Sequence, residues 1–176
     1  MRDAGGELIL VDGDDVEVGT CGKLETHRRG LRHRAFSVFV KDGRGRLLLQ
    51  RRAAGKYHSA GLWANTCCGH PRPGEAVARA ARRRLGEEMG FDCELRAVGR
   101  HAYRADVGGN LVEDEVVHLF VGRHDGAIAP NPDEVVEYVW LTPAELAAEV
   151  AGQRHRVSAW LLDYLEHLGD AIAAWN

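Results

Sequence analysis

Residues 69–91, GHPRPGEAVARAARRRLGEEMGF, constrain the fold most, because they join a Pro-Gly loop to one well-defined helix. Residues 75–89 are rich in alanine and in charged side chains. Their apolar positions recur at helical spacing and share one face: Val77, Ala81, Leu85 and Met89. Gly90 follows as a plausible left-handed cap. The stretch therefore predicts one amphipathic helix that is entered from a long loop.

Two hairpins are predicted ahead of this helix, because apolar runs rich in β-forming residues flank Asp-Gly turns. The first hairpin joins residues 8–11 to residues 16–20, and the second spans residues 35–51. Alternation in the second hairpin predicts one set of side chains on a single face of the sheet: Phe36, Val38 and Val40.

Three strands and two helices are predicted after the helix. The strands cover residues 93–106, 111–125 and 134–141. The sequence TPAELAAEVA begins with a capping-box threonine, has proline at the first helical position, and predicts a helix from residue 142 onward. Residues 154–174 predict a final amphipathic helix. This order of elements is typical of an α/β or α+β domain.

Composition and charge exclude several classes of function. A chain of 176 residues with 45% hydrophobic content can bury one sizeable core, so a single domain over residues 1–176 is expected. The net charge of −3, without a basic block, argues against a nucleic-acid partner. The apolar run at residues 8–11 is too short for a signal segment or a membrane span. We therefore expect a cytoplasmic monomer that acts on a small molecule and not at a membrane.

The loop at residues 65–75, NTCCGHPRPGE, has three readings: a disulfide, a metal knuckle, or a catalytic thiol beside a metal ligand. Disulfides rarely persist in a reducing compartment, and the four cysteines are irregularly spaced. The sequence also contains no C-x-x-C pair for a zinc knuckle. The loop is long, glycine-rich and reactive, so functional residues are expected in it. A thiol beside a metal-ligating histidine is expected to be tuned.

The helix and its loop resemble the Nudix box, GX5EX7REUXEEXGU. The matching positions are Gly69, Glu75, Arg83, Leu85, Glu87, Glu88, Gly90 and Phe91. One position departs, because Arg84 stands where the box has a glutamate. The resemblance implies a Nudix-type mixed β-sheet core flanked by helices, with carboxylates facing divalent ions on a diphosphate. The reversed charge at Arg84 argues against hydrolysis but not against the fold.

The loop NTCCGHP also resembles the signature of type 1 isopentenyl diphosphate isomerases, which use the Nudix fold for a proton shift. The similarity continues from KLETHRRGLRHRAFSVF through LVEDEVVHLF to SAWL. It implies interconversion of isopentenyl and dimethylallyl diphosphate in isoprenoid biosynthesis. Two alternatives stay open, a Nudix hydrolase of a nucleoside diphosphate derivative and a non-catalytic module that binds phosphate or metal.

This resemblance also implies two metal sites. One divalent ion, Mn²⁺ or Zn²⁺, would be bound by three histidines and two glutamates: His27, His33, His70, Glu113 and Glu115. The step from His27 to His33 is one residue shorter than in some members of the family. A Mg²⁺ ion would accompany the diphosphate through Glu88. Cations implied at the diphosphate are Lys23, Arg52, Lys56 and Arg84.

Four residues are implied in the chemistry. Cys68 would act at C2 of the substrate, while Glu115 with Tyr103 would supply or relay the proton on the opposite face. Trp160 would be the aromatic wall beside a tertiary carbocation. Three residues receive no role: Cys67, His118 and His124. The other arginines at residues 82–84 are expected to be solvated.

Overall fold

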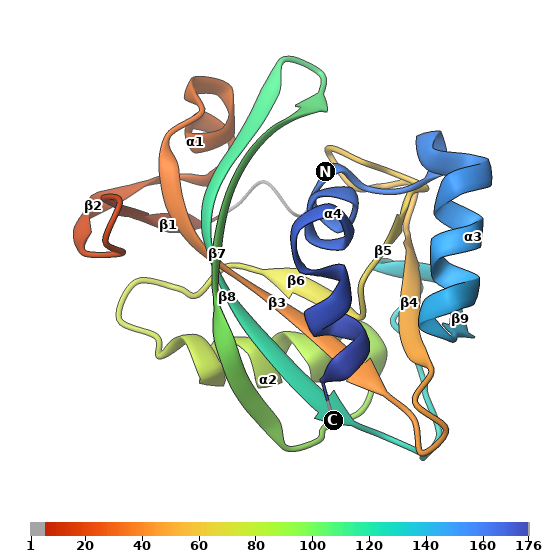
Figure 1. Cartoon of the computed structure of the whole chain (residues 1–176). Helices are drawn as coiled ribbons and strands as arrows, with labels where there is room; N and C mark the ends of the chain where they lie inside the picture. The colour runs from red at the N-terminus through yellow and green to blue at the C-terminus, as the bar shows by residue number, and fades with distance from the viewer. Residues whose placement is uncertain (1–5, 176) are drawn as a thin grey trace.

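The computed structural model describes residues 6–175, which form a mixed sheet with helices on both faces (Figure 1). Strands β3 (Arg32–Lys41) and β8 (Leu111–Arg123) run parallel to each other through its middle. Alternate residues of β3 point to opposite faces. Phe36, Val38 and Val40 share one face, as predicted, and pack against helix α2, while Ala35 and Phe39 pack against α4.

The remaining strands complete the sheet around this pair. The first predicted hairpin is β1 (Glu7–Val11) and β2 (Glu17–Gly22), and β3 with β4 (Leu47–Arg52) is the second. The three strands predicted later are also confirmed, as β7 (Leu95–Gly108), β8 and β9 (Val135–Leu141). Strands β5 (Trp63–Ala64) and β6 (Cys67–Gly69) lie in the loop before α2 and were not predicted.

Helix α2 (Val77–Met89) begins two residues later than predicted. Its apolar side chains Ala81, Leu85 and Met89 are fully buried, which confirms the predicted face. Gly90 ends it at φ 73°, and a Cβ there would lie 2.1 Å from the Ala129 carbonyl oxygen. Glycine is therefore required at this position, where the chain that follows residue 129 packs closely against the end of α2.

The other helices differ more from expectation. Helix α1 (Lys23–Arg29) was not predicted, whereas α3 (Pro143–Gln153) has the predicted capping box at Thr142. The last helix was predicted over residues 154–174, but that boundary is wrong. Residues Arg154–Arg156 form a 3-10 turn, and α4 covers Ala159–Ala174. The break arises because Val157 pairs with Trp63 in a β-bridge.

Within residues 6–175, the helices are too short or too polar to cross a lipid bilayer.

Candidate active site

A cavity of about 570 Å³ opens beside α2 and α4. It gathers side chains that are far apart in the sequence, among them every cation that the sequence predicted at the diphosphate. The predicted site residues that line it are Lys23, Arg52, Lys56, Cys68, His70, Arg84, Glu88, Tyr103, Glu113, Glu115 and Trp160. The fold therefore brings the predicted catalytic and cationic residues into one place.

Strand register aligns two of these residues, Glu115 and Tyr103, with His33 across the sheet. His33 of β3 lies opposite Glu115 of β8, and Glu115 lies opposite Tyr103 of β7. These three side chains lie in a row on the same face of the sheet, because residues opposite each other on neighbouring strands point to the same side. The tyrosine hydroxyl donates to Glu115 Oε2 at 3.0 Å.

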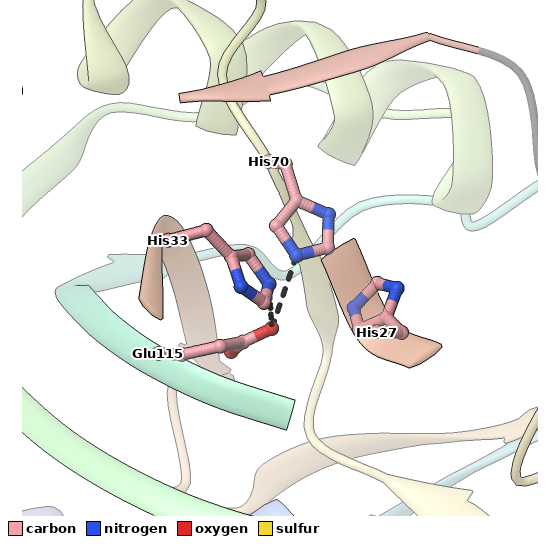
Figure 2. A group of neighbouring side chains, drawn as sticks. All are labelled: His27, His33, His70 and Glu115. Atoms are coloured by element: carbon pink, nitrogen blue, oxygen red, sulfur yellow. Dashed lines mark hydrogen bonds and ion pairs between the residues drawn. The ribbon is translucent and has the colours of Figure 1, made fainter. Parts of the chain in front are cut away.

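Four potential metal ligands converge at one end of this row (Figure 2). One ligand atom from each lies within 4.8 Å of the others: His27, His33, His70 and Glu115. His27 comes from α1, and His70 follows β6. His27 and His33 are fully buried. The shorter step between these two histidines is therefore compatible with convergence, since it contains only the end of helix α1 and the turn at Gly30.

The state of these imidazoles fits a divalent metal ion. His33 Nδ1 donates to the Leu31 carbonyl at 2.8 Å, and His27 Nδ1 contacts the Tyr57 hydroxyl at 2.8 Å. The Nε2 atoms of both are buried: that of His27 has no hydrogen-bond partner within residues 6–175, and that of His33 lies 3.3 Å from Glu115 Oε1. Imidazoles fixed at one nitrogen, with the other buried among further ligand groups, are typical of metal ligands.

Burial and charge set the protonation of this group. Burial lowers the pKa of His27 to about 3 and that of His70 to about 4, so both rings are neutral, as metal binding requires. Burial also opposes the charge on His33, but its 3.3 Å contact with Glu115 outweighs burial and raises the pKa of this ring. The same contact and that of His70 hold the pKa of Glu115 well below its ordinary value, against the effect of burial.

Glu113 was predicted as a fifth ligand, but the structure leaves it outside this group. Its Oε2 accepts the Tyr103 hydroxyl at 2.5 Å, and its Oε1 lies 3.3 Å from His58 Nε2. Burial and the charge of Glu115 raise the pKa of Glu113. His58 was not predicted, because a lone histidine in a loop carries no pattern that marks it.

The thiol of Cys68 is held by a buried network. It donates to Asn65 Oδ1 at 3.0 Å and lies 3.3 Å from Ser37 Oγ. Asn65 Oδ1 also accepts the indole N–H of Trp160 at 3.2 Å, and Ser37 Oγ lies 2.9 Å from the Tyr164 hydroxyl. A single amide therefore connects the predicted catalytic thiol with the predicted aromatic wall. Asn65, Ser37 and Tyr164 were not predicted.

Burial raises the pKa of Cys68 to about 12, so the side chain is a thiol at neutral pH. We expected a tuned thiol, and the shift is upward, as burial in an apolar environment produces. Cys67 lies on the other face of β6, fully buried against α2. The two adjacent cysteines therefore face different environments, and only Cys68 of the pair lines the cavity.

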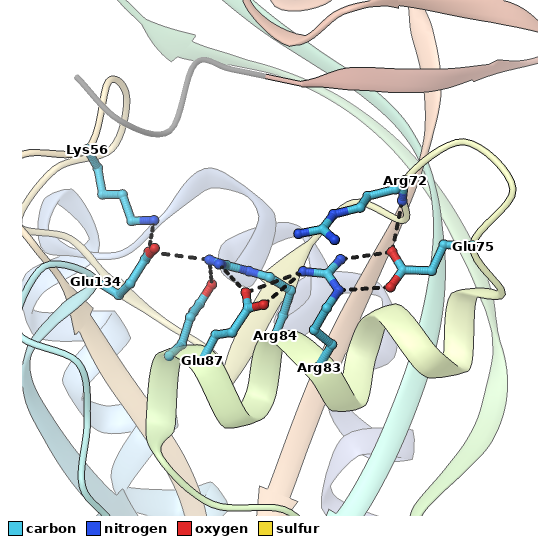
Figure 3. Close-up of polar contacts among 8 residues, drawn as sticks. Lys56, Arg72, Glu75, Arg83, Arg84, Glu87 and Glu134 are labelled. Atoms are coloured by element: carbon cyan, nitrogen blue, oxygen red, sulfur yellow. Dashed lines mark hydrogen bonds and ion pairs between the residues drawn. The ribbon is translucent and has the colours of Figure 1, made fainter.

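Cations and carboxylates alternate along the part of the cavity lined by α2 (Figure 3). Arg84 forms ion pairs with Glu88, with Glu87 at 2.9 Å and with Glu134 at 3.3 Å. Lys56 also pairs with Glu134. These cations are held in place by carboxylates, as a preformed site for a polyanion with its metal ion would require.

The expectation that the neighbouring arginines are solvated holds for Arg82 but is wrong for Arg83. Arg82 is exposed and pairs with Asp92, but Arg83 lines the cavity with a side chain only 23% exposed. Its guanidinium donates to both carboxylate oxygens of Glu75 at 2.8 Å. Glu75 Oε2 also accepts the Arg72 backbone N–H at 3.0 Å. The pair thus fastens the loop to α2.

The ion pair between Arg83 and Glu75 predicts a pH-dependent contribution to the free energy of unfolding. Hydrogen bonds from Arg83 lower the pKa of Glu75 from 4.5 to about 2. A lowered pKa in the folded state stabilises the protein above the unfolded-state pKa, and the stabilisation disappears as pH falls toward the folded-state value. We expect Glu75→Gln to lower the free energy of unfolding at pH 7. Urea denaturation should show that its difference from the wild type shrinks between pH 4.5 and about pH 2. A difference that stays constant over this range would contradict the assignment.

His118 and His124 lie outside the cavity. His118 Nε2 contacts Asp15 Oδ2 at 2.7 Å. The His124 ring stacks on Phe91 with centroids 3.9 Å apart. Packing and hydrogen bonding account for both residues.

Fold and site together define a Nudix protein: the NUDIX domain family model matches residues 31–161. Solved structures agree at the level of the fold. DR0079 from Deinococcus radiodurans superposes with a TM-score of 0.75 at 20% identity, covering 91% of this chain and 97% of that one. The MutT protein from Methanosarcina mazei gives 0.64 at 18% identity, covering 82% and 96%.

Curated relatives are much closer in sequence. A Burkholderia multivorans protein is 53% identical over 162 residues, 92% of each chain. A Streptomyces griseus protein is 50% identical over 168 residues, 94% of this chain and 84% of the relative. Both are named isopentenyl-diphosphate Delta-isomerase. The chain belongs to the isopentenyl-diphosphate Delta-isomerase family of Nudix proteins.

Proposed function

We propose that this protein interconverts isopentenyl diphosphate and dimethylallyl diphosphate in isoprenoid biosynthesis. The observation that carries the proposal is the content of one cavity. It holds a buried thiol, a tyrosine bonded to two glutamates, an indole, and a wall of cations. A proton shift in an alkenyl diphosphate needs a proton donor, a proton acceptor, stabilisation of a carbocation and a site for the diphosphate, and these groups can supply all four.

The chemistry explains why two proton-transfer groups are needed. Protonation of the terminal alkene carbon, C4, produces a tertiary carbocation, and loss of a proton from C2 then gives dimethylallyl diphosphate. Glu115 with Tyr103 is proposed to relay the proton to C4: the proton is that of the tyrosine hydroxyl, which is hydrogen-bonded to the Glu115 carboxylate within the cavity and is replaced from solvent. Cys68 is proposed to accept the proton that leaves C2.

The high pKa of Cys68 constrains this step. A thiolate whose conjugate acid has such a high pKa is a strong base, which favours removal of a proton from carbon. At neutral pH, however, only a small fraction of Cys68 is thiolate in the substrate-free protein. We therefore expect the thiolate to form only with substrate bound. Over one turnover the Glu115–Tyr103 pair gives up one proton and the Cys68 thiolate gains one, so the pair takes a proton from solvent and Cys68 releases one before the next turnover.

A divalent ion of the Mn²⁺ or Zn²⁺ type fits His27, His33, His70 and Glu115, because these ligands suit such ions. When bound, it supplies positive charge that stabilises the carboxylate form of Glu115. Glu113 as a further ligand stays a prediction, since Tyr103 and His58 hold its carboxylate here. We propose that Glu88 binds a Mg²⁺ ion that accompanies the diphosphate.

The diphosphate is proposed to lie against the cationic wall. Arg84 can donate two hydrogen bonds to phosphate oxygens, while Lys23 and Lys56 supply point charges. Hydrolysis of a nucleoside diphosphate derivative is the weaker candidate, because Arg84 occupies a position where the Nudix box provides a carboxylate. The cavity also contains Cys68 and Trp160, which a hydrolase has no evident need for.

Trp160 is expected to stabilise the carbocation through the face of its indole. It is 3% exposed, and it lines the cavity. Cation–π attraction at a desolvated site is worth about 2 kcal/mol, which corresponds to roughly thirtyfold in rate. Trp160→Phe should lose part of the turnover rate and Trp160→Leu at least this much, with little change in diphosphate affinity. Steady-state kinetics of both variants would measure the difference.

Trp63→Leu is the matched control, because this half-buried tryptophan packs in the core without lining the cavity. Equal rates for Trp160→Phe and Trp160→Leu would reduce Trp160 to a wall without an electronic role.

Product analysis tests the proposed function against its alternatives. Purified protein is incubated with isopentenyl diphosphate and Mg²⁺, and, separately, with nucleoside diphosphate derivatives. Dimethylallyl diphosphate without released phosphate supports an isomerase. Cleavage of a diphosphate bond supports a hydrolase, and binding without any product supports a non-catalytic module.

A further inference from the structure

A second group of potential metal ligands lies away from the cavity, between β7 and α4. It consists of His101, Asp163 and His167, whose ligand atoms also lie within 4.8 Å of one another. His101 Nε2 is 2.5 Å from Asp163 Oδ1, and His167 Nδ1 is 3.4 Å from Asp163 Oδ2. The two imidazole centroids are 5.7 Å apart. One carboxylate thus lies between two histidines.

The arrangement depends on the fold and not on one segment alone. Asp163 and His167 are four residues apart on α4 and therefore share a face of the helix. His101 comes from β7, which packs against that helix. The side chains of His101 and Asp163 are 16% and 25% exposed, and that of His167 is 54% exposed. The group is therefore anchored on its inner side and open to solvent on its outer side, which leaves coordination positions for water.

We propose that His101, Asp163 and His167 bind a divalent transition-metal ion of the zinc class, separate from the ion in the cavity. Two imidazoles and a carboxylate suit zinc, copper and nickel, whereas Mg²⁺ prefers an all-oxygen shell. Zinc binds nitrogen at about 2.0–2.1 Å. His167 lies on the surface of its helix, so a rotation of its side chain can bring all three donors to such an ion.

An ion at this position would connect α4 and β7, which both contribute side chains to the wall of the cavity. Helix α4 carries Trp160 and Tyr164, and β7 carries Tyr103. The His101 ring lies 5.8 Å from the Tyr164 ring, which in turn lies 6.0 Å from Tyr103. The ion would clamp α4 to β7 and so stabilise the wall that holds the indole and the thiol network.

Metal analysis after equilibrium dialysis tests the proposal on the full chain without a histidine tag. Dialysis against Zn²⁺ should load two ions per wild-type chain, and His167→Gln should load one. His155→Gln is the matched control, since this exposed histidine lies on the 3-10 turn outside both groups, and it should keep two ions. His33→Gln reports on the cavity site separately, because it should lose the other ion.

Thermal unfolding provides a second readout that does not depend on activity. Zn²⁺ should raise the melting temperature of the wild type and of His155→Gln more than that of His167→Gln, and Mg²⁺ should not reproduce the difference. Asp163→Asn should match His167→Gln. The proposal is overturned if His167→Gln and Asp163→Asn keep the wild-type zinc content and thermal shift, because the three residues would then form only a hydrogen-bonded cluster.

Discussion

Cys68→Ala should abolish isomerisation while the fold and the metal content persist. A methyl group cannot accept the proton that leaves C2, and loss of a positioned acid or base typically costs about 10²- to 10⁴-fold in rate. The remaining contacts of the network, from Asn65 to Trp160 and from Ser37 to Tyr164, do not depend on the sulfur. Turnover should be measured with isopentenyl diphosphate, alongside circular dichroism and metal analysis.

Cys67→Ala is the matched control, because Cys67 is the neighbouring cysteine but packs against α2 on the other face of β6. It should stay active and lose stability by about 1 kcal/mol, as is usual for a point substitution. Equal loss of activity in both variants would show that the loop is merely fragile. Near-normal activity of Cys68→Ala would remove Cys68 from the mechanism.

Glu115→Gln should abolish isomerisation and also weaken metal retention. The change keeps the shape of the side chain but removes the charge that His33 and His70 contact at 3.3 Å and 3.0 Å. It also removes the carboxylate to which Tyr103 donates. Turnover should fall by about 10²- to 10⁴-fold, and metal analysis of the purified variant should show less than the wild-type content.

Glu137→Gln on β9 is the control, since Glu137 is an exposed glutamate that pairs with Arg51. It should match the wild type in both measurements. A fully loaded and fully active Glu115→Gln would reject both roles. A fully loaded but inactive variant would retain the proton-transfer role and reject the role in metal binding.

Local periodicity explains which elements could be predicted. Strands β3 and β8 and helix α2 carry apolar residues at the spacing of their own structure, and Gly90 marks an end that sterics require. Helix α1 lacks such a pattern. It has seven residues, it packs against β8, and its Thr26 and His27 are buried, so tertiary packing defines it. The break before α4 depends in the same way on a distant partner, Trp63.

The site residues likewise divide into those that the sequence could predict and those that depend on tertiary contacts. The predicted ligands His27, His33, His70 and Glu115 do converge: strand register places His33 beside Glu115, and the end of α1 and the residue after β6 bring His27 and His70 to them. Asn65, Ser37 and Tyr164 could not be predicted. Their importance follows from the pairing of Ser37 with Cys68 between β3 and β6, and from the packing of α4 over both. Such contacts depend on register, which sequence patterns do not specify for a strand as short as β6.

The central claim is that this cavity adds a proton at C4 and removes one at C2 of an intact diphosphate. The most direct measurement is nuclear magnetic resonance of isopentenyl diphosphate incubated with the wild-type protein and Mg²⁺ in heavy water. We predict deuterium in a methyl group of dimethylallyl diphosphate, exchange at C2, and an unchanged phosphorus signal for the diphosphate. Released phosphate, or unlabelled and unconverted substrate, would contradict the account.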